Sequence, residues 1–509
     1  MGIMAVAPAS SPHKKSDFRE GYIAYCQGNY AAALKKWRPL AENGAAEAQV
    51  NLGIMYANGQ GVGLDDGQAL AWYRRAAESD HAKAQFNLAV AHERGRGVEA
   101  DPAAALAWYG RAADNGYAPA YFALGRFHDE GIGVARDPKA AATWYEKAAE
   151  SGDARGQCAL ATLHESGDLG ASDLDRARHW YGQAAARDHA PACFHLGRLH
   201  DDALEGDLAL AHKWYGVAAE HGYAPACHRL GLLYLNGRGV AQDEARALTF
   251  LRQAANEGLG DAMLAMGEAH EHGRGALRNA DQALKWYRLG ADHKHPDCCY
   301  ALGRMYENGK GVTADLTQAV DWYRLAADAG HGPSLHRLAD MHRTGHGVSR
   351  DDARALDYVR RAATTGYAPA CCDLGGQFLE GAGVPRDPAA AATLFRAAAG
   401  QGHAPACERL ARLYLKGLGV AASDSEAVAW LRKGAERDHA GCQYMLGLQY
   451  AEGSGVEKDL VAAYTWLDIA VKNGSAVALK ARGTYGRALK PAELDQAEQR
   501  ARDWTPPKP

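Results

Sequence analysis

A self-similar pattern with a period of 36 residues constrains this chain of 509 residues more than any other feature. A large apolar residue, usually tryptophan, recurs with that step, apart from one step of 35 and one of 34. This series is Trp37, Trp72, Trp108, Trp144, Trp180, Trp214, Phe250, Trp286, Trp322, Tyr358, Leu394, Trp430 and Trp466. A fixed period is the signature of an array in which each unit buries its apolar face only against its neighbours.

A second series, of Leu or Met followed by Gly or Ala, runs in phase with the first. Its members are Leu52, Leu88, Leu124, Leu160, Leu196, Leu230, Met266, Leu302, Leu338, Leu374, Leu410 and Leu446. Pro119 marks the start of the helix that carries Leu124, and the glycines from Gly131 end it. Asp137 is predicted to be the N-cap of a following helix that Gly152 stops. Each repeat is therefore predicted to be an antiparallel helix pair, which we name helix A and helix B.

The repeat has a consensus that extends beyond these two anchors. It reads Ala-x3-Leu-Gly-x2-Tyr/His-x2-Gly-x-Gly-Val-x2-Asp-x3-Ala-x2-Trp-Tyr-x2-Ala-Ala-x2-Gly. This pattern closely resembles the Sel-one-like repeat family, a relative of the tetratricopeptide repeats, whose own units repeat at 34 residues. The resemblance implies that the protein is bacterial. The resemblance implies an all-α fold: a right-handed α–α superhelical solenoid of about twelve 36-residue helix–loop–helix repeats with terminal caps.

Four segments follow from this interpretation. Residues 1–16 are predicted to be a disordered leader, with a signal peptide as the alternative, because no basic segment precedes the short apolar run. Residues 17–44 form an N-terminal capping helix pair without the glycine loop. Residues 45–474 hold the twelve repeats. Residues 475–509 form C-terminal capping helices and a loose tail rich in proline.

The array is irregular between residues 165 and 207. One loop there reads Gly167-Asp-Leu-Gly170, and the next runs from Asp201 to Asp207, without the Gly-x-Gly-Val motif and two residues shorter. We expect the curvature to change in this region. Neutral drift and a functional bend are both consistent with the sequence.

Charge and composition restrict the partners of the chain. Lys and Arg number 57 and Asp and Glu 61, so the net charge is −4, which argues against binding nucleic acid or an anionic membrane. No stretch has the ~20 consecutive apolar residues that a membrane span needs. The ten cysteines show no bridging pattern, which favours a reducing compartment, and we expect the protein in the cytoplasm.

No catalytic, cofactor or metal site is predicted. Histidine recurs four residues after the Leu anchor, at His92 and His128 for example, but Tyr and Phe occupy the same position in other repeats. A packing role therefore explains this series better than a metal site. Gly-x-Gly recurs only at expected helix ends, and no GxGxxG, GxSxG or HExxH arrangement appears.

The remaining surface is that of helix A, which is expected to line the concave side. Positions one before and two after the Leu anchor carry Arg126, His195, Arg198, Arg229, Arg304, Arg337, Arg409 and Arg412. They could form a groove that binds carboxylates or an acidic peptide. The alternative is local pairing, such as that of Arg126 with Asp129, of Arg198 with Asp201, or of Arg304 with Glu307.

The predicted function is thus a non-catalytic protein–protein interaction scaffold or adaptor whose protein or peptide partner lies along the concave surface. The alternative function is a secreted or periplasmic binder that acts as a toxin antagonist or a host-contact factor. The sequence leaves the oligomeric state open.

Overall fold

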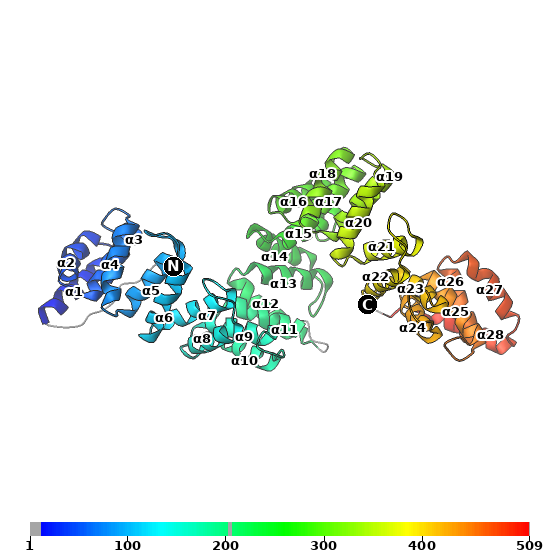
Figure 1. Ribbon diagram of the computed structural model, residues 1–509, viewed down its shortest axis with the longest axis horizontal. Helices are drawn as coiled ribbons and strands as arrows, with labels where there is room; N and C mark the ends of the chain where they lie inside the picture. Colours follow the sequence, from blue (N-terminus) through cyan, green and yellow to red (C-terminus); the bar gives the residue numbers. More distant parts are fainter. Residues whose placement is uncertain (1–11, 202–205, 508–509) are drawn as a thin grey trace. The chain divides into compact units, whose positions relative to one another are not determined.

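The computed structural model describes residues 12–201 and 206–507, and these residues form 28 α-helices and no strand (Figure 1). The fold is therefore an all-α solenoid of consecutive helix pairs, as predicted. Residues 1–11 of the predicted leader and 508–509 of the predicted tail lie outside the described residues. The first helix begins at Pro12, within the range assigned to the leader, and residues 504–507 of the tail are not helical.

The helices divide into two compact units, residues 1–253 and 254–509, and the division falls within α14 (Glu244–Asn256). The helices before α14 are α1 (Pro12–Cys26), α2 (Tyr30–Glu42), α3 (Ala46–Asn58), α4 (Asp66–Glu78), α5 (Ala82–Arg94), α6 (Pro102–Asp114), α7 (Ala118–Glu130), α8 (Pro138–Glu150), α9 (Ala154–Ser166), α10 (Leu174–Ala185), α11 (Ala190–Asp201), α12 (Leu208–Glu220) and α13 (Ala224–Asn236).

The second unit continues the same alternation of A and B helices. Its helices are α15 (Gly260–His272), α16 (Ala280–Asp292), α17 (Pro296–Asn308), α18 (Leu316–Asp328), α19 (Gly332–Thr344), α20 (Asp352–Thr364), α21 (Ala368–Glu380), α22 (Pro388–Gly400), α23 (Ala404–Lys416), α24 (Asp424–Ala435), α25 (Ala440–Glu452), α26 (Leu460–Lys472), α27 (Ala476–Gly486) and α28 (Pro491–Asp503).

The loop between α7 and α8 shows how the sequence sets the helix pair. Gly131 ends α7 in the left-handed conformation, with φ of 71°, which glycine adopts without steric cost. The Asp137 side chain accepts hydrogen bonds from the backbone N–H groups of Lys139 and Ala140, both at 3.0 Å, and so caps α8. The Asp137 N–H donates to the His128 carbonyl at 2.8 Å and closes the loop. The predicted helix stop and N-cap are confirmed.

Small residues set the distance between helix B and the next helix A. In most repeats, the position four after the large apolar anchor of helix B is Ala, and so is the position four before the Leu anchor of the next helix A. Cys442 on α25 breaks this pattern, and its partner position on α24 is Gly434. A Cβ at residue 434 would lie 2.3 Å from Cys442 Sγ, so the smaller glycine compensates for the larger cysteine.

We therefore expect Gly434→Ala to destabilise the protein by about 1–2 kcal/mol through overpacking, although alanine is the better helix former. In a Cys442→Ala background, the same change should be neutral or stabilising, because the pair then matches the alanines of other repeats. Urea denaturation of the two single variants and the double variant measures the coupling. Additive effects of the two substitutions would contradict this packing.

The N-terminal cap is the helix pair α1 and α2. Trp37 on α2 is fully buried, and its indole N–H donates to the Phe18 carbonyl at 3.1 Å. Gly21 on α1 gives room for this ring, because a Cβ there would lie 2.5 Å from Trp37 Nε1. Lys36 joins the pair on its surface through Asp17, at 2.7 Å. The cap thus packs through an aromatic side chain rather than through the glycine loop of the repeats.

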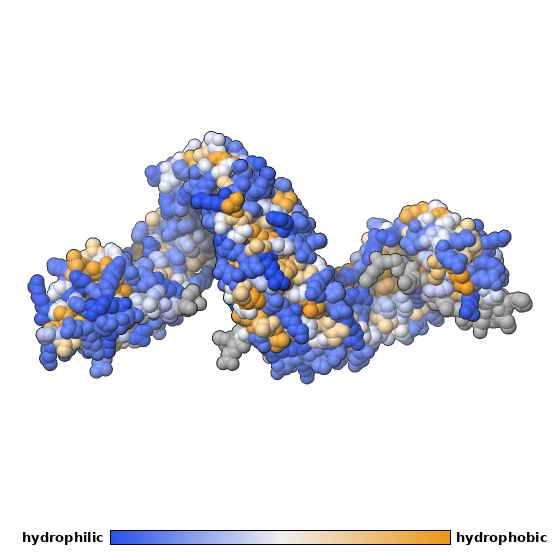
Figure 2. Space-filling view, turned by 180° about the vertical axis from the view of Figure 1, so that it is seen from behind, coloured by the Kyte–Doolittle hydropathy of each residue, from blue (hydrophilic) through white to orange (hydrophobic). Residues whose placement is uncertain are grey.

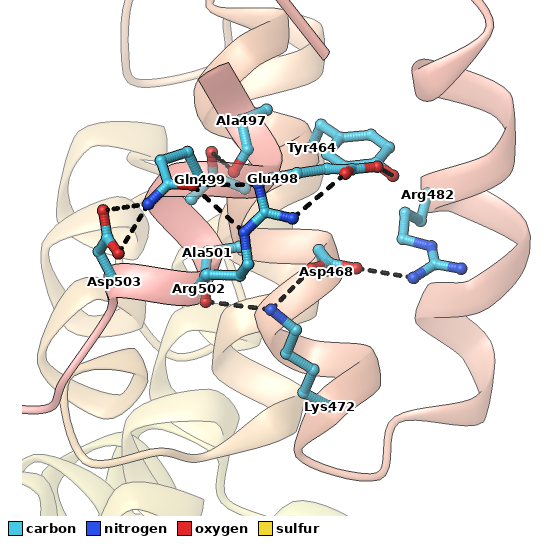
Figure 3. A network of polar contacts seen from close by, with 11 residues as sticks. Tyr464, Asp468, Lys472, Arg482, Ala497, Glu498, Gln499, Ala501, Arg502 and Asp503 are labelled. Atoms are coloured by element: carbon cyan, nitrogen blue, oxygen red, sulfur yellow. Dashed lines mark hydrogen bonds and ion pairs between the residues drawn. The ribbon is translucent and has the colours of Figure 1, made fainter. Parts of the chain in front are cut away.

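The C-terminal cap is attached to the last repeat by polar contacts (Figure 3). Asp468 on α26 has a side chain only 10% exposed, and its two oxygens lie 3.0 Å from Lys472 Nζ and 2.6 Å from an Arg482 guanidinium nitrogen on α27. Lys472 also donates to the Ala501 carbonyl on α28 at 3.1 Å. One buried carboxylate therefore holds α27 directly and α28 through Lys472.

Candidate functional site

The A helices of neighbouring repeats contact one another within each unit, as α7 does α9 and α23 does α25. We call the surface that these helices form the A-helix face. The sequence predicted a binding groove on this face, lined by the eight residues from Arg126 to Arg412. The structure shows most of those side chains engaged in contacts, several of them with the preceding repeat.

Six repeats contain a buried tyrosine paired with an acid. The tyrosine follows the large apolar anchor of helix B, and its hydroxyl donates to a carboxylate five residues after the Leu anchor of helix A, at 2.5–3.5 Å. The pairs are Tyr109 with Glu93, Tyr145 with Asp129, Tyr181 with Glu165, Tyr215 with Asp201, Tyr287 with Glu271 and Tyr323 with Glu307.

The next repeat along the chain supplies a cation to most of these acids. Arg126 contacts Glu93, Arg198 contacts Glu165, and Arg229, Arg304 and Arg337 approach Asp201, Glu271 and Glu307 in the same way. The local pairs proposed as the alternative are not the ones observed, because these arginines reach back to the preceding repeat. Arg126 does pair locally as well, but with Glu130, at 3.5 Å. Sequence spacing within one helix does not reveal such contacts between repeats.

The junction around Glu307 shows the electrostatics of these pairs. The Glu307 side chain is 8% exposed, lies 3.2 Å from Arg337 Nε and accepts from the Tyr323 hydroxyl at 2.7 Å. Burial alone would raise the pKa of Glu307, but the hydrogen bonds from Arg337 and Tyr323 outweigh it and hold the pKa below its usual value. These groups therefore join neighbouring repeats.

The three other predicted groove residues have different surroundings. His195 stacks on Tyr181 of the preceding repeat, with ring centroids 4.9 Å apart. Arg409 donates to the Cys372 carbonyl at 3.4 Å and lies over the Phe395 ring. Arg412 pairs within its own helix with Glu408, at 2.6 Å. Their role in partner binding stays a prediction.

A groove of about 890 Å³ opens in the first unit, between α3 and α9. We name it the α5 groove, because α5 contributes much of its lining, including Phe86, Asn87 and Val90. Tyr73 and Tyr109 reach it from the B helices, and Arg126 is the one predicted groove residue that lines it. The sequence analysis missed the other lining residues, because it selected charged positions only. A groove also requires small side chains that leave space between the helices.

The lining of the α5 groove is rich in cations. Lys83, Arg94, Arg96, Arg126 and Arg155 line it, against two acids, Asp66 and Glu93. Glu93 is already paired with Arg126, and Arg155 with Asp153. Arg94 and Arg96 are exposed and form no ion pair with any residue in the described ranges. The groove therefore offers uncompensated positive charge beside aromatic rings.

The histidines four residues after the Leu anchor lie on the A helices, and nine of the ten cysteines are buried. His342 stacks on Tyr358, with centroids 5.6 Å apart, as expected for a packing role. Cys371 is buried and points its thiol at the Ala363 carbonyl, 3.5 Å away. Burial raises the pKa of several of these thiols, that of Cys372 to about 11, so they are protonated at neutral pH. Among residues 12–201 and 206–507, no group of three or more His, Cys, Asp or Glu could hold a metal ion.

Burial lowers the pKa of a set of histidines, so the native state should lose stability at mildly acidic pH. The set is His81, His189, His195, His331 and His403. Because the unfolded chain binds protons near pH 6.5 and the folded chain resists them, the free energy of unfolding should fall as the pH drops from 7.5 to 5.5. Urea denaturation at both pH values checks this. Equal or greater stability at pH 5.5 would contradict it.

The hydropathy of the surface and of the helices bears on the class of protein. On the face shown in Figure 2, most residues are hydrophilic and the apolar ones form small groups. None of the helices in the described part of the chain has the length and apolar character needed to span a membrane. Repeated helix pairs define a helical-repeat protein, and the α5 groove is its candidate binding surface.

The comparison with protein families identifies the repeat. The Sel1 repeat model matches twelve consecutive segments, the first at residues 46–81 and the last at 440–475. The chain therefore belongs to the Sel1 repeat family, the Sel-one-like family that its consensus resembles. Proteins of this family generally mediate protein–protein interactions and are generally non-catalytic. The search of curated proteins found no match.

Several solved structures are similar. A protective antigen of uropathogenic Escherichia coli strains, which displays an SLR fold, is 29% identical over 92% of this chain and 93% of its own, with a TM-score of 0.52. A Sel1 repeat protein of Oxalobacter formigenes is 28% identical over 47% of this chain and 96% of its own, with a TM-score of 0.40. An immunity protein of Pseudomonas aeruginosa is 22% identical over 43% and 81%, with a TM-score of 0.31.

Proposed function

We propose that this protein is a non-catalytic scaffold that binds an acidic segment of a partner protein in the α5 groove, on the A-helix face. The observation that carries the proposal is the groove itself, which combines about 890 Å³ of space with aromatic walls and exposed cations. Helical repeats commonly recognise extended peptides on such surfaces, where a few anchor residues set the specificity.

Charge supports an acidic partner. Arg94 and Arg96 stand at the end of α5 and in the loop after it, where their guanidinium groups are exposed to an incoming segment. A guanidinium can bind a carboxylate through two parallel hydrogen bonds, which suits Asp and Glu side chains. Phe86 and Phe122 supply apolar surface beside these cations. An acidic segment that also carries apolar residues fits this lining.

The ion pairs of the arginines determine which charges can be reversed in a test. Arg337 faces the buried Glu307, so Arg337→Glu would place two acids together and unfold the junction. Arg94 and Arg96 can be reversed without breaking an ion pair of the described residues. The double variant Arg94→Glu/Arg96→Glu therefore separates binding from folding.

Selection from a library of random peptides displayed on phage tests the proposal without a known partner. The wild-type protein should enrich peptides rich in Asp and Glu, and Arg94→Glu/Arg96→Glu should lose that enrichment while retaining the circular dichroism spectrum of the wild type. The same reversal at Arg360, an exposed residue of α20 that does not line the groove, is the control, and Arg360→Glu should leave the enrichment intact. Enrichment that is indifferent to peptide charge, or identical for all three proteins, would overturn the proposal.

We propose the cytoplasm as the compartment, on the cysteine argument from the sequence. Fractionation of the source cells should then recover the protein with cytoplasmic markers. A periplasmic or secreted pool would instead favour the alternative function, a binder that acts as a toxin antagonist or a host-contact factor.

A further inference from the structure

Tyrosine on helix B and an acid on helix A occur together in this chain. Among the twelve repeats, seven carry tyrosine directly after the large apolar anchor, and six of these carry the carboxylate that accepts its hydrogen bond. The five repeats without this tyrosine have Leu, Val or Phe there, and none of them has the acid. The two residues therefore form one structural unit.

The first repeat is the exception. Tyr73 is present, but Ala57 occupies the position of the acid. The cation is also missing, because the two positions of the second repeat that carry arginine at other junctions hold Asn87 and Val90. All four residues line the α5 groove, which therefore opens at the place that an internal acid fills in the other tyrosine-bearing repeats.

Two polar groups are left without partners at this place. Tyr73 is 4% exposed, and its hydroxyl has no hydrogen-bond partner among the described residues. Asn87 is 6% exposed, and its side-chain N–H2 group likewise has none. His195, at the same register as Asn87, stacks on the tyrosine of the preceding repeat, so this register lies beside the tyrosine. Buried donors without acceptors are rare in folded proteins and call for a ligand or a water.

We propose that Tyr73 and Asn87 form a subsite for one carboxylate of the partner, the side chain of a Glu or Asp residue, which takes the place of the acid missing at Ala57. This inference rests on the proposed function, and it names the residue type that enters the α5 groove most deeply. The occupant is a carboxylate because that is the acceptor that the equivalent tyrosines bind in six other repeats.

The surroundings of the subsite suit an anion that arrives from solvent. Burial raises the pKa of the Tyr73 hydroxyl, so this group stays protonated and can donate at neutral pH. Asp66 and Arg96 both act electrostatically on that hydroxyl, with opposite signs, and both line the groove. Arg96 therefore offsets the repulsion that Asp66 exerts on an entering carboxylate.

Two substitutions test the subsite directly. Tyr73→Phe removes the donor and keeps the ring, and Ala57→Glu supplies the internal acid that the other repeats have. Tyr145→Phe is the matched control, because Tyr145 is the equivalent residue two repeats further on, pairs with Asp129 and does not line the groove. Labelled hexaglutamate is the probe, with hexaglutamine as its neutral counterpart.

Hexaglutamate should bind the wild type more tightly than hexaglutamine does. Tyr73→Phe should lower the affinity for hexaglutamate about tenfold, because it removes one hydrogen bond to a charged group. Ala57→Glu should lower this affinity at least as much. Tyr145→Phe should leave the affinity unchanged. Binding that is lost in Arg94→Glu/Arg96→Glu but unaltered in Tyr73→Phe and Ala57→Glu would overturn the subsite and leave the proposed function standing. Equal affinity of the wild type for both peptides would overturn both.

A measurement without ligand tests the same geometry. Ala57→Glu should raise the melting temperature, because the new carboxylate accepts from Tyr73, and the rise should vanish in Ala57→Glu/Tyr73→Phe. An equal shift in the two backgrounds would show that residue 57 does not reach the hydroxyl and would overturn the proposal.

Discussion

Gly419→Asn should destabilise the protein by about 3 kcal/mol, whereas Gly417→Asn, two residues earlier in the same loop, should cost about 1 kcal/mol or less. Both glycines have left-handed backbone conformations, with φ of 62° at Gly417 and 71° at Gly419. Asparagine tolerates this conformation, so the backbone angle does not distinguish the two sites. The difference lies in what a side chain would meet.

A Cβ at residue 417 would lie 3.3 Å from the Ala422 side chain, a contact that a small shift relieves. A Cβ at residue 419 would lie 2.1 Å from the Pro388 carbonyl oxygen, at the start of α22 in the preceding repeat. That oxygen belongs to the backbone, so the two repeats would have to separate. The second glycine of the loop is thus a contact between repeats as well as part of a turn.

Amide exchange of α22 and α23 in the two variants is the appropriate measurement, because an array of repeats need not unfold in two states. Protection should fall sharply at this junction in Gly419→Asn and little in Gly417→Asn. Similar losses in the two variants would show that backbone conformation, and not close approach, requires glycine at position 419.

Glu307→Ala should destabilise the junction between α17 and α19 by about 2–4 kcal/mol. The substitution leaves the buried Tyr323 hydroxyl without its acceptor and the Arg337 guanidinium without its ion-pair partner. Amide exchange of α17, α18 and α19 reports the loss locally, and urea denaturation reports its effect on the chain.

Tyr73→Phe is the contrasting variant. The Tyr73 hydroxyl has no partner in the described residues, so its removal should be neutral or stabilising, whereas Tyr323→Phe should cost about 1–2 kcal/mol. A loss of stability in Tyr73→Phe as large as that in Tyr323→Phe would show that Tyr73 already has an internal partner.

The sequence predicted the repeats well because their signals are either periodic or local. The leucine and tryptophan series recur with the period of the repeat, whereas the Asp137 N-cap and the Gly131 helix stop depend on residues a few positions apart, and the structure confirms the helix pairs, the cap and the stop. The residues near Pro12 carry no repeat signal, and there the predicted leader and the observed helix α1 overlap.

The candidate site was harder to predict because its contacts cross between repeats. Arg126 lies three residues from Asp129 in sequence, but it pairs with Glu93, in the preceding repeat. The α5 groove forms where Ala57 and Val90 replace the acid and the arginine of other repeats, and no sequence motif marks such a replacement. The sequence did contain one signal. Tyr73 occupies the tyrosine position of the repeat consensus, but Ala57 stands where six other repeats have the acid that pairs with this tyrosine.

Photo-crosslinking of bound hexaglutamate tests the central claim, an acidic segment in the α5 groove, most directly. The photoreactive residue p-benzoylphenylalanine replaces Phe86, which lines the groove, or Ala107, an exposed residue of α6 that does not. Position 86 should crosslink to hexaglutamate, and an excess of unlabelled peptide should suppress the product, whereas position 107 should give none. Crosslinking at position 107 that equals or exceeds that at position 86 would contradict the account.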